Sequence, residues 1–220
     1  MPYKLSPSTL NLLKECPRCF WLQFNKGIKR PEGIFPSLPS GMDRILKTHF
    51  DRFMEKGILP PELCDNKECK DLKLFDNKEL LDEWRNNRKG IQWKDGENIL
   101  KGAVDNILKK GDKLIVLDYK TRGFPLKEDT AEHYQDQLDI YNFLLRKNNF
   151  KTEDYAYLLF YHPKEVDEGG NIIFNTDLVK MKIDVKNAEK IWKKALETLE
   201  GEMPKPSEEC EFCKWVELCK

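Results

Sequence analysis

The segment KGAVDNILKKGDKLIVLDYK, residues 101–120, constrains the fold more than any other part of the sequence. Two largely apolar runs flank Gly111 and Asp112, and glycine in the first position of a two-residue loop favours a type II′ turn. The segment therefore predicts a hairpin in which Lys110 faces Lys113 and the numbers of paired residues sum to 223. Apolar side chains occupy both faces: Ile107, Leu114 and Val116 on one, and Val104, Leu108, Ile115, Leu117 and Tyr119 on the other. Such a hairpin needs cover on both faces, which indicates a central sheet between helices.

Two acidic residues come opposite each other in this register. Asp105 faces Asp118 with Cβ atoms about 5 Å apart, and Lys120 lies on the same face as Asp118. Neighbouring carboxylates at the end of a buried sheet repel each other and lose hydration, and a divalent cation between them removes that penalty. A lysine beside the ion can orient a water nucleophile or offset negative charge. The alternative is a pair of surface acids with a salt bridge to Lys120, and a one-residue register slip would separate the three side chains.

The rest of the chain shows helical and strand patterns around this hairpin. Helices are expected over residues 40–57, 77–87, 130–147 and 185–200, strands over 154–163 and 178–184, and a second hairpin turn at Gly169 and Gly170. Pro17 is expected to interrupt an N-terminal helix. In the helix of residues 40–57, one side is expected to carry Met42, Ile45, Leu46, His49 and Phe53. The element order predicts an α/β or α+β fold in a single domain, residues 1–220, with a core over 41–200.

Charge and hydropathy narrow the class of protein. The 38 basic and 38 acidic residues cancel, so any nucleic-acid site must be a local patch. The first residues lack the apolar region of a signal peptide, and no run reaches the roughly 20 apolar residues of a membrane span. We expect a soluble cytoplasmic protein that binds no membrane.

The seven cysteines indicate a metal site rather than disulfides, because their number is odd and the cytosol keeps thiols reduced. They are Cys16, Cys19, Cys64, Cys69, Cys210, Cys213 and Cys219. Paired as Cys16/Cys19 and Cys210/Cys213, the two CxxC spacings suit zinc and leave Cys219 spare. Cys64 and Cys69 have no assigned role and are expected to be free thiols.

The hairpin and the helix after it resemble the PD-(D/E)XK nuclease superfamily, in particular its RecB-like branch. The matching elements are GxxD at Gly102 to Asp105, (D/E)xK at Asp118 to Lys120, and QxxxY at Gln137 and Tyr141. His49, on the helix that begins near Gly41, takes the place of the family's metal-binding histidine. The resemblance implies a restriction-endonuclease-like core with a central mixed sheet flanked by helices.

The resemblance also implies a site for Mg²⁺ or Mn²⁺. The expected metal ligands are His49, Asp105, Asp118 and the main-chain carbonyl of Tyr119. Carboxylate and carbonyl oxygens suit these hard ions. Together with Asp105 and Asp118, Lys120 would be catalytic, positioning the attacking water or offsetting charge on phosphorus.

Substrate contacts are expected from three further residues: Gln137, Tyr141 and Arg122. The first two would line the site and help hold Lys120 or the DNA strand. Arg122 would contact a neighbouring phosphate, or is simply a solvated residue at the end of the strand.

A second centre follows from the same resemblance. RecB-like nucleases, and the exonucleases associated with CRISPR spacer acquisition, join one N-terminal cysteine to three C-terminal ones. The segment CEFCKWVELC has their CxxC-x5-C spacing, and CPRCFWL matches the N-terminal element. The resemblance thus implies a 4Fe-4S cluster on Cys16, Cys210, Cys213 and Cys219, which would join residues 1–30 and 201–220 in one lobe. Zinc at the two CxxC pairs remains the alternative, since thiolates suit both.

These features predict a metal-dependent deoxyribonuclease, an exonuclease on single-stranded DNA or DNA ends, in DNA repair, recombination or CRISPR adaptation. The sequence has no GxxxxGK[ST] phosphate loop, so a helicase motor or CRISPR-adaptation protein would be a separate partner. The basic segment 25–30, with Phe20 and Trp21, would either grip single-stranded DNA or pack the N-terminal helix. The rival functions are a catalytically silent DNA-binding subunit of a repair complex and a zinc-binding structural protein.

Overall fold

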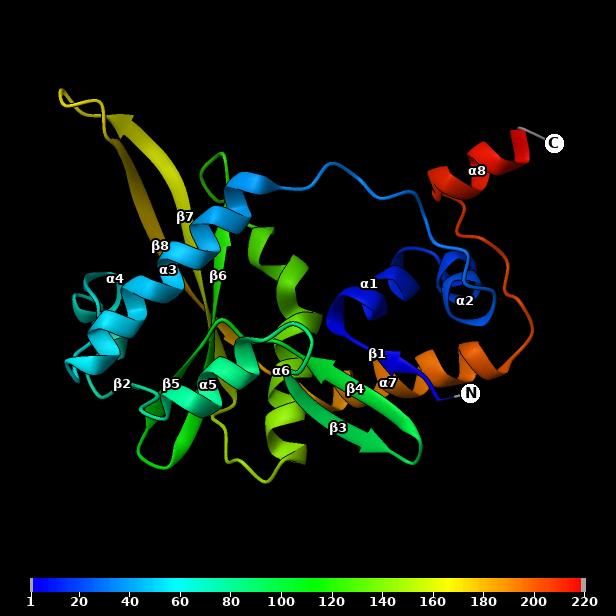
Figure 1. Cartoon of the computed structure of the whole chain (residues 1–220), viewed down its shortest axis with the longest axis horizontal. Coiled ribbons are helices and arrows are strands. Elements are labelled where there is room, and N and C mark those ends of the chain that lie inside the picture. Colours follow the sequence, from blue (N-terminus) through cyan, green and yellow to red (C-terminus); the bar gives the residue numbers. More distant parts are fainter. Residues whose placement is uncertain (1, 219–220) are drawn as a thin grey trace.

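The computed structural model describes residues 2–218 and contains two sheets with helices around them (Figure 1). The strands are β1 (Lys4–Leu5), β2 (Lys73–Leu74), β3 (Ile91–Asp95), β4 (Asn98–Gly102), β5 (Asn106–Lys110), β6 (Lys113–Thr121), β7 (Tyr155–Val166) and β8 (Ile172–Lys182). The helices are α1 (Pro7–Glu15), α2 (Pro17–Asn25), α3 (Ser37–Glu55), α4 (Pro61–Cys64), α5 (Lys78–Arg85), α6 (Gln135–Lys147), α7 (Val185–Glu200) and α8 (Glu211–Leu218). Short 3₁₀ turns cover Lys67–Cys69 and Thr130–Tyr134.

The larger sheet has the order β2-β5-β6-β7-β8, and the smaller one β1-β4-β3. Both are mixed, because β6 pairs in parallel with β7 and β1 in parallel with β4, while the other pairs are antiparallel. The expected α/β fold with a mixed central sheet flanked by helices is confirmed, as is the second hairpin, formed by β7 and β8.

The predicted register of the β5–β6 hairpin is also confirmed. The pairs run from Lys110 with Lys113 to Asn106 with Leu117. Gly111 has a φ of +60°, and Asp112 does not share this left-handed region, which is the pattern of a type II′ turn. The turn therefore fixes which residues of β5 and β6 face each other.

One part of the hairpin prediction is wrong: the strand expected before Gly111 is not continuous back to Lys101. β4 ends at Gly102 in the smaller sheet, and β5 begins at Asn106 in the larger one. Three residues, 103–105, cross between the sheets, and the main-chain N–H of Val104 donates to the carbonyl of Trp84 at 3.2 Å. Asp105 consequently stands just before the ladder rather than inside it.

Both faces of the larger sheet are covered, as the two apolar faces of the hairpin predict. On one face Ile107, Leu114 and Val116 join the core that includes Leu138 and Leu144 of α6. On the other face Leu108, Ile115, Leu117 and Tyr119 pack with Leu46 and Phe50 of α3. Val104, expected on the second face, belongs to the first core because it lies in the crossing segment.

Helix α3 presents a different side to the sheet than the apolar pattern predicts. Its buried residues are Leu46 and Phe50, one turn apart, whereas the side chain of Ile45 is 55% exposed. Of the expected side, Leu46 is buried and Phe53 packs against the same core, but Ile45 is exposed and the packed side is turned toward Phe50. This rotation decides which polar residues of α3 reach the ends of β5 and β6.

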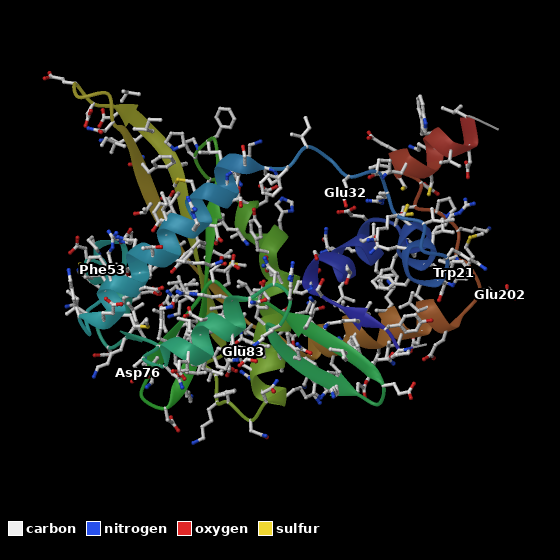
Figure 2. The ribbon with its side chains drawn as sticks, viewed as in Figure 1. Trp21, Glu32, Phe53, Asp76, Glu83 and Glu202 are labelled. Atoms are coloured by element: carbon white, nitrogen blue, oxygen red, sulfur yellow. The ribbon has the colours of Figure 1, made fainter. Side chains whose placement is uncertain are left out.

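Helices α2 and α8, near the two ends of the chain, lie on the side of the molecule away from β7 and β8 (Figure 1). Helix α1 ends at Glu15 and α2 begins at Pro17, as the proline predicts. The indole nitrogen of Trp21 donates to the carbonyl of Gly201 at 3.0 Å, and Figure 2 shows Trp21 beside the segment of Glu202. Among the described residues, no helix combines the length and apolar character needed to span a membrane.

Candidate active site and cysteine site

Asp118 and Lys120 project from the same face of β6 and contact each other. Asp118 is only 2% exposed, and its Oδ2 pairs with the ammonium group of Lys120. Alternation along the strand brings the two side chains to one face, since they are two residues apart. The structure therefore places the acid and the lysine of the DxK element together.

Gln137, on the first turn of α6, connects these two side chains. Its Oε1 accepts from Lys120 Nζ at 3.1 Å, and its Nε2 donates to Asp118 Oδ1 at 3.3 Å. The same Nε2 donates to the hydroxyl of Tyr141, one turn along the helix, at 2.7 Å. Gln137 and Tyr141 thus hold the side chains of Asp118 and Lys120 in place.

Asp105 reaches the site from the segment that crosses between the sheets. Its Oδ2 accepts the main-chain N–H of Tyr119 at 2.9 Å, and its Oδ1 lies 3.0 Å from the ammonium group of Lys47 on α3. Arg85, at the end of α5, donates from Nε to the main-chain carbonyl of Asp105 at 2.7 Å. These contacts turn the Asp105 carboxylate toward the end of β6, beside Asp118.

Burial and charge raise the pKa of Asp118 to about 7. Loss of hydration is the largest cause and the nearby charge of Asp105 the next, with Lys120 acting in the opposite direction. For Lys120, burial lowers the pKa, but the charge of Asp118 outweighs it and the net shift is upward. The two aspartates thus carry an unfavourable interaction that two lysines relieve only in part.

This donor set fits a divalent cation of the Mg²⁺ or Mn²⁺ kind. Two carboxylates with a main-chain segment beside them offer hard oxygens. The Oδ2 of Asp118 is buried and accepts no hydrogen bond among the described residues, so its only partner is the Lys120 charge. The main chain of Tyr119 lies against Asp105 through the N–H contact, which keeps its carbonyl in the candidate ligand set.

His49 is not brought to this group. Its Nε2 lies 3.1 Å from Glu62 Oε1, and the same oxygen of Glu62 accepts from the hydroxyl of Tyr161 at 3.0 Å. Within the described part of the chain, no group of three or more metal-binding side chains includes His49 together with Asp105 and Asp118. The rotation of α3 accounts for this: Lys47, rather than His49, faces the aspartates.

Arg122 is the first residue after β6, which ends at Thr121. Its main-chain N–H donates to the carbonyl of Tyr161 at 2.9 Å. Its side-chain Nε is buried and has no hydrogen-bond partner among residues 2–218. The structure therefore does not join Arg122 to the Asp118, Lys120 and Gln137 group.

Three residues of the site were missed by the sequence reasoning. Lys47 neutralises Asp105, Arg85 fixes the main chain of Asp105, and the ring of Tyr134 lies 4.5 Å below the ammonium group of Lys120. Only Lys47 carried a local signal, because it follows Asp43 by four residues and pairs with it at 2.8 Å. The other two contacts depend on the tertiary fold.

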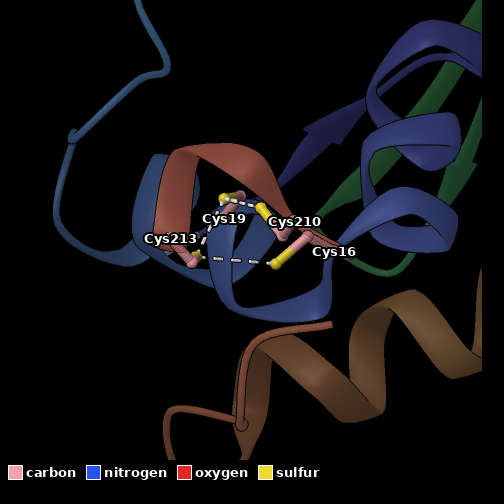
Figure 3. Close-up of side chains that lie close together, drawn as sticks. All are labelled: Cys16, Cys19, Cys210 and Cys213. Atoms are coloured by element: carbon pink, nitrogen blue, oxygen red, sulfur yellow. Dashed lines mark hydrogen bonds between the residues drawn. The ribbon is translucent and has the colours of Figure 1, made fainter. Parts of the chain in front are cut away.

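Four buried cysteines from the two ends of the chain form a compact group (Figure 3). Sγ of Cys19 lies 3.6 Å from Sγ of both Cys210 and Cys213, and Sγ of Cys16 lies 3.9 Å from that of Cys213. All four sulfurs lie within 4.8 Å of one another. The group thus contains Cys19, while Cys219 lies outside the described residues. Cys64 is exposed and Cys69 is buried in the core beneath α3.

A charged side chain supports this group. Arg30 donates from Nη2 to the sulfur of Cys210 at 3.5 Å and pairs through Nη1 with Glu15 at 2.5 Å. At Cys16, burial raises the thiol pKa, but main-chain hydrogen bonds at Cys19 and Ser207 outweigh it and lower the pKa to about 6. Burial raises the pKa of Cys19. A cation is the natural partner for four such sulfurs, because it favours their thiolate forms.

A buried carboxylate, a second carboxylate and a lysine at the end of a mixed sheet, held by a helical Gln and Tyr, define a nuclease-like site. The chain belongs to the PD-(D/E)XK nuclease superfamily, whose family model matches residues 4–220. Among curated proteins, none matches the chain. Membership of this superfamily suggests a nuclease that acts on DNA.

Proposed function

We propose that this protein is a metal-dependent deoxyribonuclease that hydrolyses phosphodiester bonds at the Asp105, Asp118 and Lys120 site. The observation that carries the proposal is the joint contact of Gln137 with Asp118 and Lys120, which brings the carboxylate and the ammonium group of the DxK element together. The resemblance extends the proposal to exonuclease action on single strands or DNA ends in repair, recombination or CRISPR adaptation.

Asp105, Asp118 and the carbonyl of Tyr119 are the proposed ligands. Bound there, Mg²⁺ or Mn²⁺ would supply a Lewis acid and a bound water of lowered pKa. We leave His49 out of the ligand set, because Glu62 holds its imidazole. Asp118 must be ionised to bind the cation, and burial with the nearby charge of Asp105 raises its pKa without the cation to about 7, so the cation competes with a proton at this carboxylate.

Lys120 has the geometry of a positioning and charge-offsetting group. Its ammonium lies between Asp118, Gln137 and the face of Tyr134, which limits the directions in which it can point. From there it donates hydrogen bonds to the attacking water or to a phosphate oxygen as negative charge grows on it. Gln137 keeps this orientation, and Tyr141 keeps that of Gln137.

A nuclease assay on labelled DNA tests the proposal. Purified protein with Mn²⁺ is expected to degrade single-stranded DNA labelled at either end, and Lys120→Ala and Asp118→Asn to abolish degradation. Lys110→Ala, at the other end of the same hairpin, is the matched control and is expected to cleave normally. Cleavage that survives Lys120→Ala would remove this site, and DNA binding without any cleavage would favour the silent-subunit alternative.

For the cysteine group we propose a single tetrahedral zinc ion. An ion bound to four sulfurs at about 2.3 Å places those sulfurs about 3.8 Å apart. Three of the separations here are 3.6 to 3.9 Å, and all four sulfurs lie within 4.8 Å of one another. A 4Fe-4S cluster has its irons at separate corners, so it would hold the sulfurs further apart. The zinc would crosslink α2, near the N-terminus, to the segment that begins α8, near the C-terminus.

Metal analysis of anaerobically purified protein distinguishes zinc from a 4Fe-4S cluster at the cysteine group. Zinc is expected at one ion per chain, lost in Cys19→Ser and kept in Cys219→Ser. A brown protein with iron that survives Cys19→Ser and is lost in Cys219→Ser would establish the cluster instead. Cys64→Ser, which removes an exposed thiol, is the control for either outcome.

A further inference from the structure

A groove of about 910 Å³ opens beside the candidate active site. Its walls come from α1, from the turn before β3, from the end of β4, and from α6 and α7. Helix α1 lies beside α6 (Figure 1). Gln137 and Tyr141 line the groove, and so does Tyr134, whose ring lies under Lys120. The groove therefore begins at the residues that hold the catalytic lysine.

The walls of the groove mix polar side chains with a few accessible apolar ones. Leu10, Leu13 and Ile140 are buried behind the surface, whereas Tyr134 and Ile191 are half-buried and the ring of His133 is exposed. Accessible rings such as those of His133 and Tyr134 are surfaces on which unpaired bases stack. A duplex keeps its bases inside and offers only phosphates and groove edges, so it gains little from such surfaces.

The lining carries an excess of positive charge. Four lysines border the groove, Lys14, Lys89, Lys101 and Lys194, while Asp136 is the only acid. Lys14 pairs with Asp136 at 2.8 Å, and Lys101 donates to the carbonyl of Asn87 at 2.7 Å. Lys89 and Lys194 have no ion-pair partner in the described part of the chain. Since the whole chain is neutral, this excess is local to the groove.

We propose that this groove binds the single-stranded DNA that leads into the active site, with phosphates on its lysines and bases against the rings of His133 and Tyr134. The proposal rests on the proposed nuclease function and adds a path for the substrate. The α1 wall continues through Cys16 into the cysteine group, so the same group that joins the chain ends also fixes one side of the groove.

Binding and its salt dependence test the groove. Anisotropy of a fluorescein-labelled single-stranded oligonucleotide is measured in EDTA, where no cleavage occurs, at several salt concentrations. The double variant Lys89→Ala, Lys194→Ala is expected to bind at least tenfold more weakly. Its slope of log K against log salt should be shallower by about 1.4, because each phosphate contact on a single strand contributes about 0.7. In Mn²⁺ its KM should rise while kcat stays unchanged.

The control replaces two exposed lysines outside the groove, Lys56 and Lys110, by alanine, and is expected to leave affinity and slope unchanged. Equal affinity and slope in the groove variant and the wild type would overturn the groove, while Lys120-dependent cleavage would still uphold the nuclease. DNA binding that depends on Lys89 and Lys194, without any cleavage, would uphold the groove and overturn the nuclease function. Tighter binding of a blunt duplex than of the single strand would overturn the single-strand assignment.

Discussion

Gly102 lies directly against the ring of Tyr141: a Cβ at position 102 would meet Cδ1 and Cε1 of that ring at 2.8 Å. The Tyr141 hydroxyl accepts from Gln137, which in turn holds Asp118 and Lys120. The glycine of the GxxD element thus allows a close approach that a side chain would block. Its role here is to let the QxxxY helix pack against the end of β4.

Gly102→Ala is therefore expected to displace Tyr141 and, through Gln137, the side chain of Lys120. We expect kcat to fall at least tenfold, and the free energy of unfolding to fall by about 1–3 kcal/mol from overpacking. Cleavage rates at saturating DNA and urea denaturation measure the two effects. Gly123→Ala is the matched control, because a Cβ there would have no neighbour within 4 Å. Full activity in Gly102→Ala would show that the Tyr141 contact is dispensable.

The sequence predicted the parts of the site that depend on local geometry. The turn at Gly111 fixed the β5–β6 register, and alternation then placed Asp118 and Lys120 on one face. The crossing at residues 103–105 was missed because its cause, a second sheet that takes β4, is a tertiary contact. The orientation of α3 places Lys47 rather than His49 beside Asp105. The apolar pattern did not predict this, because the buried residues of the helix are Leu46 and Phe50, and the pattern did not include Phe50. Cys19 could be found from its CxxC spacing, but only the fold decides its partners.

Asp118 makes the stability of the protein depend on pH. Its pKa is about 7 in the folded protein and about 3.9 when unfolded, so stability is lost as pH rises from about 4 to about 7. Asp118→Asn cannot ionise and is expected to be more stable than the wild type at pH 8 in EDTA. The gain should be smaller than the roughly 4 kcal/mol that about three pKa units represent, because the variant leaves Lys120 without its partner. The difference should vanish near pH 4. Urea denaturation at both pH values measures it.

Asp112→Asn is the control for this pH effect, because a hydrogen bond from Lys151 lowers the pKa of Asp112. It should not stabilise the protein at pH 8. An Asp118→Asn protein less stable than the wild type at pH 8 would mean that Lys120 already neutralises the penalty of the buried charge.

Substitutions of Lys47 and His49, both on α3, test the proposed ligand set by metal binding, independently of catalysis. Lys47→Met removes a positive charge 3.0 Å from Asp105, so the affinity for Mn²⁺ is expected to rise about tenfold, since a like charge at that range costs on the order of 1–4 kcal/mol. His49→Ala should leave the affinity unchanged. Titration of Mn²⁺ followed by its electron paramagnetic resonance signal, without DNA, compares the two variants. Loss of Mn²⁺ binding in His49→Ala would restore the histidine as a ligand.

Arg85 ties the active site to the folding of three elements. Its side chain is 7% exposed, Nε holds the carbonyl of Asp105, and Nη1 pairs with Asp51 of α3 at 2.7 Å. Arg85→Ala would leave the Asp51 charge short of a partner and the Asp105 carbonyl without its donor, so we expect a loss of about 3 kcal/mol in the free energy of unfolding. Lys151→Ala breaks an exposed ion pair and should change stability very little.

Because Arg85 also orients Asp105, Mn²⁺ affinity should weaken in Arg85→Ala under conditions where the variant is still folded. Unchanged Mn²⁺ affinity in the folded variant would mean that the contacts of Asp105 with Lys47 and Tyr119 suffice to position it.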